Sequence, residues 1–288
     1  MPTVDQMLRA MSRDYAGVPH WALEKDYALS YLLAGIASTE GLGEWLILKG
    51  GTALRKFSFP NYRFSEDLDF SVRQDVEIGD VDSAMGQAIG EMERLLQERG
   101  PFGVQVERLL LREPHPTGQD AFTVRVRFPT HREAQCRLKV EITRDEPVLL
   151  PPKLQNLLHG FPEELTASLW CYALEEIVAE KLRALLQSRA RLRARGWGAS
   201  RVCRDYYDLW YILRGASLEK GEIPPVVAQK CAHRGVGFES PQDFIAPALV
   251  AVAQAEWDRQ LRPFVADCPD VGQVLGELQP LVLDLWTR

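Results

Sequence analysis

The sequence predicts an α+β protein, with a mixed sheet and helices in its first half and a bundle of helices in its second. Three observations carry this prediction. The apolar run over residues 46–54 is interrupted by Gly50-Gly51, which is typical of a strand, a tight turn and a helix that begins at Thr52. Alternating apolar residues indicate further strands up to residue 143. Beyond residue 150, apolar residues recur with helical spacing.

Hydrophobic periodicity and turn residues place the elements of the first half. In chain order they are helices over residues 4–15 and 19–37, the strand and helix around the glycine turn, a strand with Asp67 and Asp69, a helix over 82–99, and strands over 103–111, 121–128 and 136–143, with a turn at 114–118. The helix over 19–37 contains Glu24, Lys25 and Asp26, which we interpret as surface ion pairs.

The proline-rich stretch over residues 147–152 predicts a domain boundary. We therefore expect one domain over residues 1–150 and a helical domain over residues 151–288. The expected helices of the second domain cover residues 173–187, 204–213, 223–231, 243–261 and 271–285.

Composition excludes several classes of protein. With 46% hydrophobic and 26% charged residues, the chain has the make-up of an ordinary globular protein. No apolar run approaches the ~20 residues needed to cross a bilayer, and the N-terminus lacks the pattern of a signal peptide. The five cysteines are scattered without Cys-x-x-Cys spacing. This argues against a disulfide framework or a zinc site, so the expected location is the reducing cytoplasm.

Asp67 and Asp69 form the first candidate site. Side chains alternate along a strand, so both carboxylates project from one face, where they repel each other unless a cation lies between them. Mg²⁺ is the usual cation where phosphates also bind. Gly50 and Gly51 allow a phosphate to approach the backbone, and the helix that begins at Thr52 offers free N–H groups. A lone Gly-Gly or Asp-x-Asp is commonly only a turn or a strand end, but their order and spacing favour a joint site.

The stretch Lys-Gly-Gly-Thr-Ala-Leu over residues 49–54, with Arg-Phe-Ser-Glu-Asp-Leu-Asp-Phe over 63–70, resembles the AbiEii family. Members of that family are toxins of AbiE (MenAT-type) toxin–antitoxin systems within the DNA polymerase β-like nucleotidyltransferase superfamily. Glu-Lys-Leu-Arg-Ala-Leu over 180–185 and Arg-Asp-x-x-Asp over 204–208 extend the resemblance, which runs over residues 21–213. It implies a polymerase β-like nucleotidyltransferase domain followed by helices, an NTP substrate, and Mg²⁺ or Mn²⁺ as cofactor.

The resemblance also implies roles for single residues. Gly50, Gly51 and Thr52 would cradle the phosphates of the NTP, and Asp67 and Asp69 would hold the metal. Glu141, on a neighbouring strand, would supply a third carboxylate, although the family more often has Asp at this place. The alternative for Glu141 is a surface ion pair with a cation of its own strand, Arg137 or Lys139.

Two further motifs supply the remaining candidates. Lys181 would contact the nucleotide phosphates, and Asp205 or Asp208 would pair with Lys181 or orient the acceptor hydroxyl. Asp205 and Asp208 are three residues apart and so share one face of a helix. Ser65 is a possible regulatory residue, because its modification close to Asp67 would switch the site off.

The acceptor implied by the resemblance is RNA, most directly the tRNA 3′ end, whose extension blocks aminoacylation and translation. The formal net charge of −6 gives no bulk attraction for nucleic acid, but residues 181–204 contain no Asp or Glu. Candidate RNA-binding residues in and near this segment are Arg189, Arg191, Arg193, Arg195 and Arg201. The alternative is a solvated helix face.

Other functions remain open at this point. A small molecule or a protein hydroxyl is the alternative acceptor, and an NTP-binding regulator without transfer is the alternative outside enzymes. The expected partners are the NTP, tRNA and a cognate antitoxin encoded nearby, and no membrane.

Overall fold

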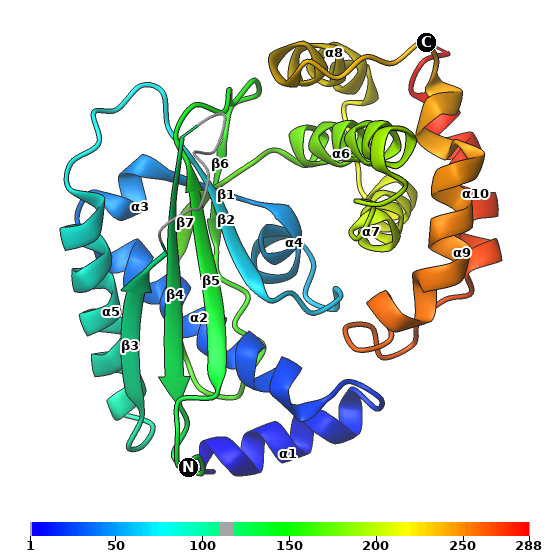
Figure 1. Cartoon of the computed structure of the whole chain (residues 1–288). Coiled ribbons are helices and arrows are strands. Elements are labelled where there is room, and N and C mark those ends of the chain that lie inside the picture. The colour runs from blue at the N-terminus through cyan, green and yellow to red at the C-terminus, as the bar shows by residue number, and fades with distance from the viewer. Residues whose placement is uncertain (1, 110–117, 288) are drawn as a thin grey trace. The chain divides into compact units, whose positions relative to one another are not determined.

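The computed structural model describes residues 2–109 and 118–287, and the contacts within it divide the chain into two units (Figure 1). Unit 1 comprises Met1–Tyr172 and Phe264–Ala266, and unit 2 comprises Ala173–Pro263 and Asp267–Arg288. The predicted domain boundary at residue 150 stays a prediction. The sheet of unit 1 continues past that residue, because two short strands follow it.

A mixed sheet of seven strands forms the centre of unit 1, in the order β3-β4-β5-β2-β1-β7-β6. Its strands are β1 (Leu46–Lys49), β2 (Asp67–Val72), β3 (Gly103–Arg108), β4 (Gln119–Arg127), β5 (Cys136–Thr143), β6 (Lys153–Asn156) and β7 (Ser168–Cys171). β2 runs antiparallel to β1 and parallel to β5, while β7 runs parallel to β1. The predicted α+β class and mixed sheet are confirmed.

Helices cover one face of this sheet. Those of unit 1 are α1 (Val4–Asp14), α2 (His20–Ser38), α3 (Leu42–Trp45), α4 (Gly50–Ala53), the π-helical turn η1 (Leu54–Ser58) and α5 (Val81–Gln97). α2 and α5 pack on each other and on the sheet (Figure 1). Leu68 and Phe70 of β2 are fully buried, so the carboxylates that alternate with them in sequence lie on the opposite face.

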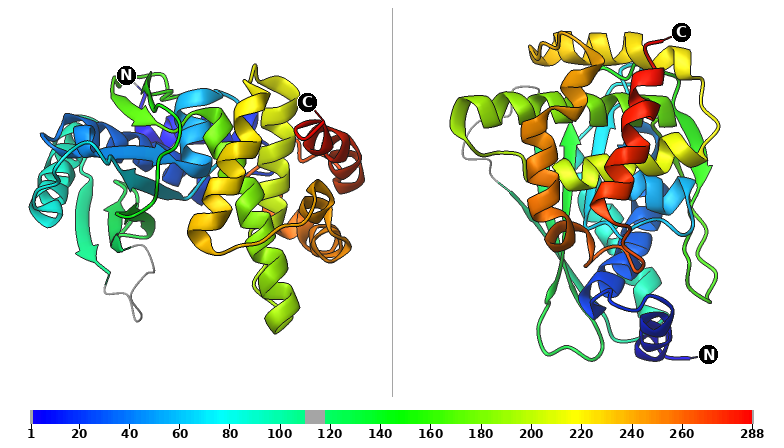
Figure 2. Two further views of the ribbon diagram at one scale, coloured as in Figure 1. Left: turned by 90° about the horizontal axis from the view of Figure 1, so that it is seen from above. Right: turned by 90° about the vertical axis from the view of Figure 1, so that its right-hand side faces the viewer.

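Unit 2 is entirely helical in its described part. Its helices are α6 (Leu174–Arg195), α7 (Val202–Gly215), η2 (Lys220–Glu222), α8 (Ile223–Arg234), η3 (Pro241–Ile245), α9 (Pro247–Leu261) and α10 (Val271–Asp284). α6 packs against α7 and α8, and α7 packs against α9 and α10 (Figure 2). No helix in the described ranges of either unit has the length and apolar character needed to cross a membrane.

Most expected elements are present, and the differences have physical causes. β6 and β7 were not predicted, because four residues are too few for alternation to be recognised. The helix expected over residues 173–187 continues to Arg195, since its polar last turns lack an apolar stripe but remain helical. The helix expected over 243–261 is divided before Pro247, which lacks a backbone N–H. The expected turn at 114–118 and the end of the strand over 103–111 fall largely outside the described residues.

Candidate active site

The glycine turn lies directly against the Asp-x-Asp strand of unit 1. Gly50 directly follows β1 and has a φ of +78°, a left-handed conformation that favours glycine. A Cβ at this position would lie 3.1 Å from Oδ2 of Asp69. The missing side chain therefore leaves a cradle beside that carboxylate, which a phosphate or a cation could enter.

Gly51 and Thr52 lie against the segment that leads into β2. A Cβ on Gly51 would lie 2.7 Å from Nη2 of Arg63 and 3.2 Å from Oγ of Ser65, so a side chain at this point would displace the Arg63 guanidinium. The Thr52 hydroxyl donates a hydrogen bond to the backbone carbonyl of Asp67, with 2.5 Å between the oxygens. The three residues predicted to bind phosphate thus contact the segment that carries the predicted metal ligands.

The pairing of the central strands brings the predicted carboxylates together. Asp69 of β2 is in register with Lys49 of β1 on one side and with Glu141 of β5 on the other. Asp67 is in register with Lys139 of β5. Residues directly opposite in neighbouring strands project from the same face, so both aspartates and Glu141 share one face of the sheet. Lys49 also lies in this row and was not among the predicted site residues.

Glu141 makes an ion pair with a cation of its own strand, the alternative expected from the sequence. Its Oε1 lies 2.9 Å from Nζ of Lys139. In residues 2–109 and 118–287, no three His, Cys, Asp or Glu side chains are arranged to hold a metal ion. Mg²⁺ is commonly held by one or two carboxylates together with substrate phosphates. Asp67 and Asp69 supply two carboxylates on one face of the sheet, and Oδ2 of Asp69 borders Gly50, so this donor set fits such an ion with nucleotide bound.

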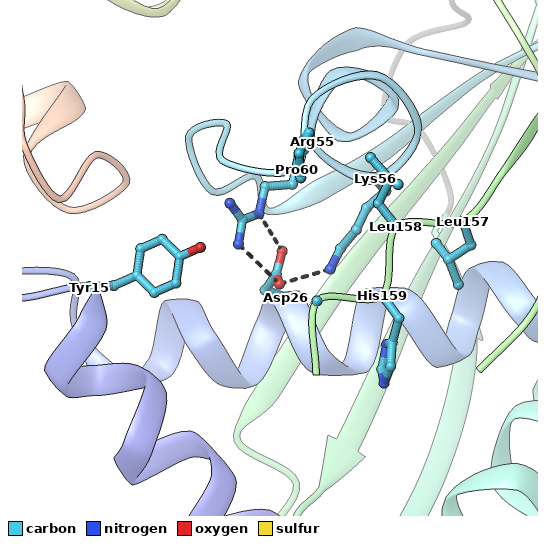
Figure 3. A pocket seen from close by; sticks show the side chains of 9 residues that line it. Tyr15, Asp26, Arg55, Lys56, Pro60, Leu157, Leu158 and His159 are labelled. Carbon is cyan, nitrogen blue, oxygen red and sulfur yellow. Dashed lines mark hydrogen bonds and ion pairs between the residues drawn. The ribbon is translucent and has the colours of Figure 1, made fainter. Parts of the chain in front are cut away.

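A buried ion cluster anchors the helical segment that follows the glycine turn. Asp26 of α2 accepts from Nε of Arg55 at 3.0 Å and lies 2.8 Å from Nζ of Lys56 (Figure 3). All three side chains are at least 95% buried, and they line a pocket together with Tyr15 and His159. The expected surface position of Asp26, and of the buried Glu24, was therefore wrong. Sequence spacing alone does not show that α2 is covered on nearly all sides.

Burial and charge shift the pKa values in this cluster. Burial alone would raise the pKa of Asp26, but the adjacent Arg55 and Lys56 hold it below its ordinary value. Burial lowers the pKa of Lys56 to about 8, and the attraction of Asp26 offsets only part of this effect. Arg55 remains charged, so the cluster carries more positive than negative charge at neutral pH.

The shifted pKa of Lys56 predicts a pH-dependent stability. Between its folded value of about 8 and its ordinary value of 10.5, the unfolded chain binds the additional proton, so stability rises with pH. Compared with Lys56→Met, the wild type should gain free energy of unfolding of about 3 kcal/mol across this window. Urea unfolding of both proteins at several pH values measures the difference. The control is Lys153→Met, at an exposed lysine, for which the difference in free energy of unfolding from the wild type should stay constant with pH. A constant difference for Lys56→Met as well would contradict the prediction.

The predicted Lys–Asp motif is assembled within unit 2. Nζ of Lys181 on α6 lies 2.9 Å from Oδ1 of Asp205 and 2.6 Å from Oδ2 of Asp208, both on α7. Asp208 is completely buried, whereas Lys181 keeps 13% of its side chain exposed. The pairing expected between the lysine and the acids is present with both aspartates, and the closer and more buried partner is Asp208.

The arginine-rich segment lies at the C-terminal end of α6 and in the loop that follows it. Arg189 pairs with Asp243 at 2.6 Å and is largely buried, so it serves the packing of unit 2. Arg191, Arg193 and Arg195 are exposed on the last turns of the helix. Trp197, in the loop, is 66% exposed and was not among the predicted site residues.

Comparison with protein families matches residues 31–277 to the family described as nucleotidyl transferase AbiEii toxin, Type IV TA system. The chain belongs to this family. A comparison with curated proteins gave no match. AbiEii membership supports nucleotidyltransferase activity with an NTP as substrate, and a toxin that has an antitoxin partner. The match includes every predicted site residue from Gly50 to Asp208, but Asp26 lies before its first residue.

Proposed function

We propose that this AbiEii protein transfers a nucleoside monophosphate from an NTP to the 3′ end of tRNA in the cytoplasm, which blocks aminoacylation. The observation that carries the transferase part is the glycine cradle beside Asp69, on the face that also bears Asp67 and Glu141. In the reaction, the acceptor oxygen forms a bond to the α-phosphorus. The bond from that phosphorus to pyrophosphate breaks, pyrophosphate leaves, and the proton of the acceptor hydroxyl passes to solvent water.

In this proposal, the residues of unit 1 bind and orient the triphosphate. The backbone N–H groups at the glycine turn would donate hydrogen bonds to the β- and γ-phosphates, and Thr52 holds the turn to β2 through its hydrogen bond to the carbonyl of Asp67. Asp67 and Asp69 would hold Mg²⁺, and Glu141 would join them if its side chain left Lys139. When bound, Mg²⁺ lowers the pKa of the attacking hydroxyl and neutralises the developing charge on pyrophosphate. The protein's contribution is then positioning and electrostatic stabilisation.

The residues of unit 2 supply a second, cationic contact in this proposal. Lys181 is suited to a triphosphate because it is a compact charge on a long stem. Asp205 and Asp208 hold its ammonium group in one place through their ion pairs. Both aspartates act as positioning residues, with Asp208 as the buried anchor.

RNA is proposed as the acceptor because of the charge on α6. The acid-free segment with Arg191, Arg193 and Arg195 gives the acidic protein a local site for a phosphate backbone. The cognate antitoxin would then protect the cell from transfer to its own tRNA.

One experiment tests the proposal directly. The purified protein is incubated with Mg²⁺, total tRNA and each of the four α-³²P-labelled NTPs separately. Label on tRNA from one or two of the NTPs is the expected result, and it identifies the donor. Pyrophosphate release without labelled RNA would keep the transferase and reject the acceptor. Tight NTP binding without pyrophosphate release would indicate a regulator.

The arginines give a separate prediction for RNA binding. Replacing Arg191 and Arg193 together by Gln should weaken binding to tRNA at low salt and flatten the dependence of affinity on salt. For each lost phosphate contact, the slope of log K against log [salt] should fall by about 0.7 to 0.9. Filter binding over a salt series measures both. The control is Arg259→Gln, at an exposed arginine of α9 paired with Glu256, and equal slopes for all proteins would remove the arginines from the interface.

Ser65 supports a second acceptor, a hydroxyl of the protein itself. Its Oγ lies 3.2 Å from where a Cβ on Gly51 would be, so the hydroxyl borders the proposed phosphate cradle. NTP-dependent transfer to Ser65 would release pyrophosphate and block the turn. The mass of the intact protein after exposure to NTP, compared with that of Ser65→Ala, tests this alternative.

A further inference from the structure

Trp197 is the most exposed large hydrophobic side chain in the described part of the chain. Its exposed fraction of 66% exceeds those of Leu154, Trp21 and Val106. An indole has the largest apolar surface of any side chain, and leaving it in water sacrifices free energy that burial would supply. Such a residue on a folded surface commonly marks a contact with another molecule.

The backbone holds Trp197 in a defined place at the end of α6. Gly196 ends the helix in the left-handed conformation, with a φ of +74°, and its N–H donates to the carbonyl of Leu192. Gly198 has a φ of +106° and packs so closely on Arg191 that a Cβ would lie 3.2 Å from the arginine Cβ. Ala199, one residue further on, is buried. The loop is thus folded against the helix on both sides of the exposed indole.

A cation already lies over the ring. The guanidinium carbon of Arg195 is 5.7 Å from the centre of the Trp197 ring, a cation–π arrangement. Arg191 and Arg193 are exposed on the preceding turns, and in the described residues none of these three arginines has a carboxylate within ion-pairing distance. Figure 2 shows this end of α6 extending past the other helices of unit 2. An accessible aromatic face and unneutralised cations therefore occur together.

We infer that Trp197 stacks on an unpaired base of a single-stranded RNA, while Arg195 and the arginines of the preceding turns contact its phosphates. Every base has a flat apolar face that an indole can cover, and phosphates complement the arginines. Bases within a duplex are already stacked on their neighbours, so the surface selects unpaired nucleotides. The inference deepens the proposed function, because it rests on RNA as the acceptor and identifies its single-stranded part as the bound element.

The test measures binding of the full chain to a short single-stranded RNA, with a blunt RNA duplex for comparison and no NTP present. Trp197→Ala should weaken single-strand binding about tenfold and leave duplex binding unchanged. Its salt slope should equal that of the wild type, because a stacked base releases no counterions. Trp197→Phe, which keeps an aromatic face, should retain most of the affinity.

Trp21→Ala is the matched control. Trp21 is 42% exposed and also has a cation over its ring, Nζ of Lys25 at 5.4 Å, but Lys25 is paired with Glu66. This variant should bind RNA as the wild type does. Unchanged single-strand binding by Trp197→Ala, or equal weakening for duplex and single strand, would overturn the inference.

The experiments distinguish a failure of this RNA-stacking inference from a failure of the proposed function. If the protein binds single-stranded RNA with the expected Trp197 signature but labels no RNA, the binding surface stands and the acceptor is wrong. If it labels tRNA while Trp197→Ala binds and reacts as the wild type does, the acceptor stands and the surface is wrong.

Discussion

Asp67→Asn should reduce nucleotide transfer by about 10³-fold or more while leaving the protein folded. The substitution keeps the size of the side chain and removes the negative charge that a metal ion requires. The backbone carbonyl that accepts the hydrogen bond of Thr52 is retained, so the glycine turn stays attached to β2. Transfer of labelled nucleotide from the preferred NTP measures the loss.

A matched control separates the loss of this carboxylate from a general change of charge. Asp75 lies shortly after β2, is 67% exposed and pairs with Arg73. Asp75→Asn removes the same charge at the surface and should transfer at the wild-type rate. Transfer at the wild-type rate by Asp67→Asn would reject the proposed metal site, and with it the assignment of this face as the active centre.

The parts of the site that follow a local pattern could be predicted from the sequence. The strand, glycine turn and helix depend on neighbouring residues, and so does the alternation that places Asp67 and Asp69 on one face. The lysine of α6 and the acids of α7 were expected to pair, and they do. These features need only the periods of helix and strand, together with the resemblance of four motifs.

Features that depend on distant packing could not be predicted. Whether Asp26 is exposed depends on η1, which supplies Arg55 and Lys56, and on the segment around His159, which lies beside it in the folded chain. The partner of Glu141 depends on side-chain conformation, since Lys139 is only two residues away and competes with any shared ion. The exposure of Trp197 depends on the local backbone, not on distant packing. Two glycines with positive φ, one on each side of Trp197, turn the chain at the end of α6. The sequence offers a signal for it: a tryptophan between two glycines beside an acid-free arginine run.

Asp26→Asn should destabilise the protein by about 3 to 5 kcal/mol. The amide leaves Arg55 and Lys56 buried without their counter-charge, and an unpaired buried charge costs far more than an exposed one. Urea unfolding followed by circular dichroism measures the effect. Asp258→Asn, which breaks an exposed pair with Arg262, should cost less than about 1 kcal/mol. Because the folded pKa of Asp26 is lowered, its contribution is full at neutral pH and is lost in acid, as pH falls through the folded value.

A second substitution distinguishes uncompensated charge from lost packing. Asp26→Asn combined with Lys56→Met removes one of the two stranded cations, so the double variant should be more stable than Asp26→Asn alone. If packing were the cause, adding Lys56→Met would give no recovery of stability.

The ion cluster is also connected to the glycine turn. Arg55, which pairs with Asp26, lies two residues after Ala53, where the short helix that carries the glycine turn ends. Weaker NTP binding by the folded fraction of Asp26→Asn would therefore identify Asp26 as a positioning residue for the phosphate cradle.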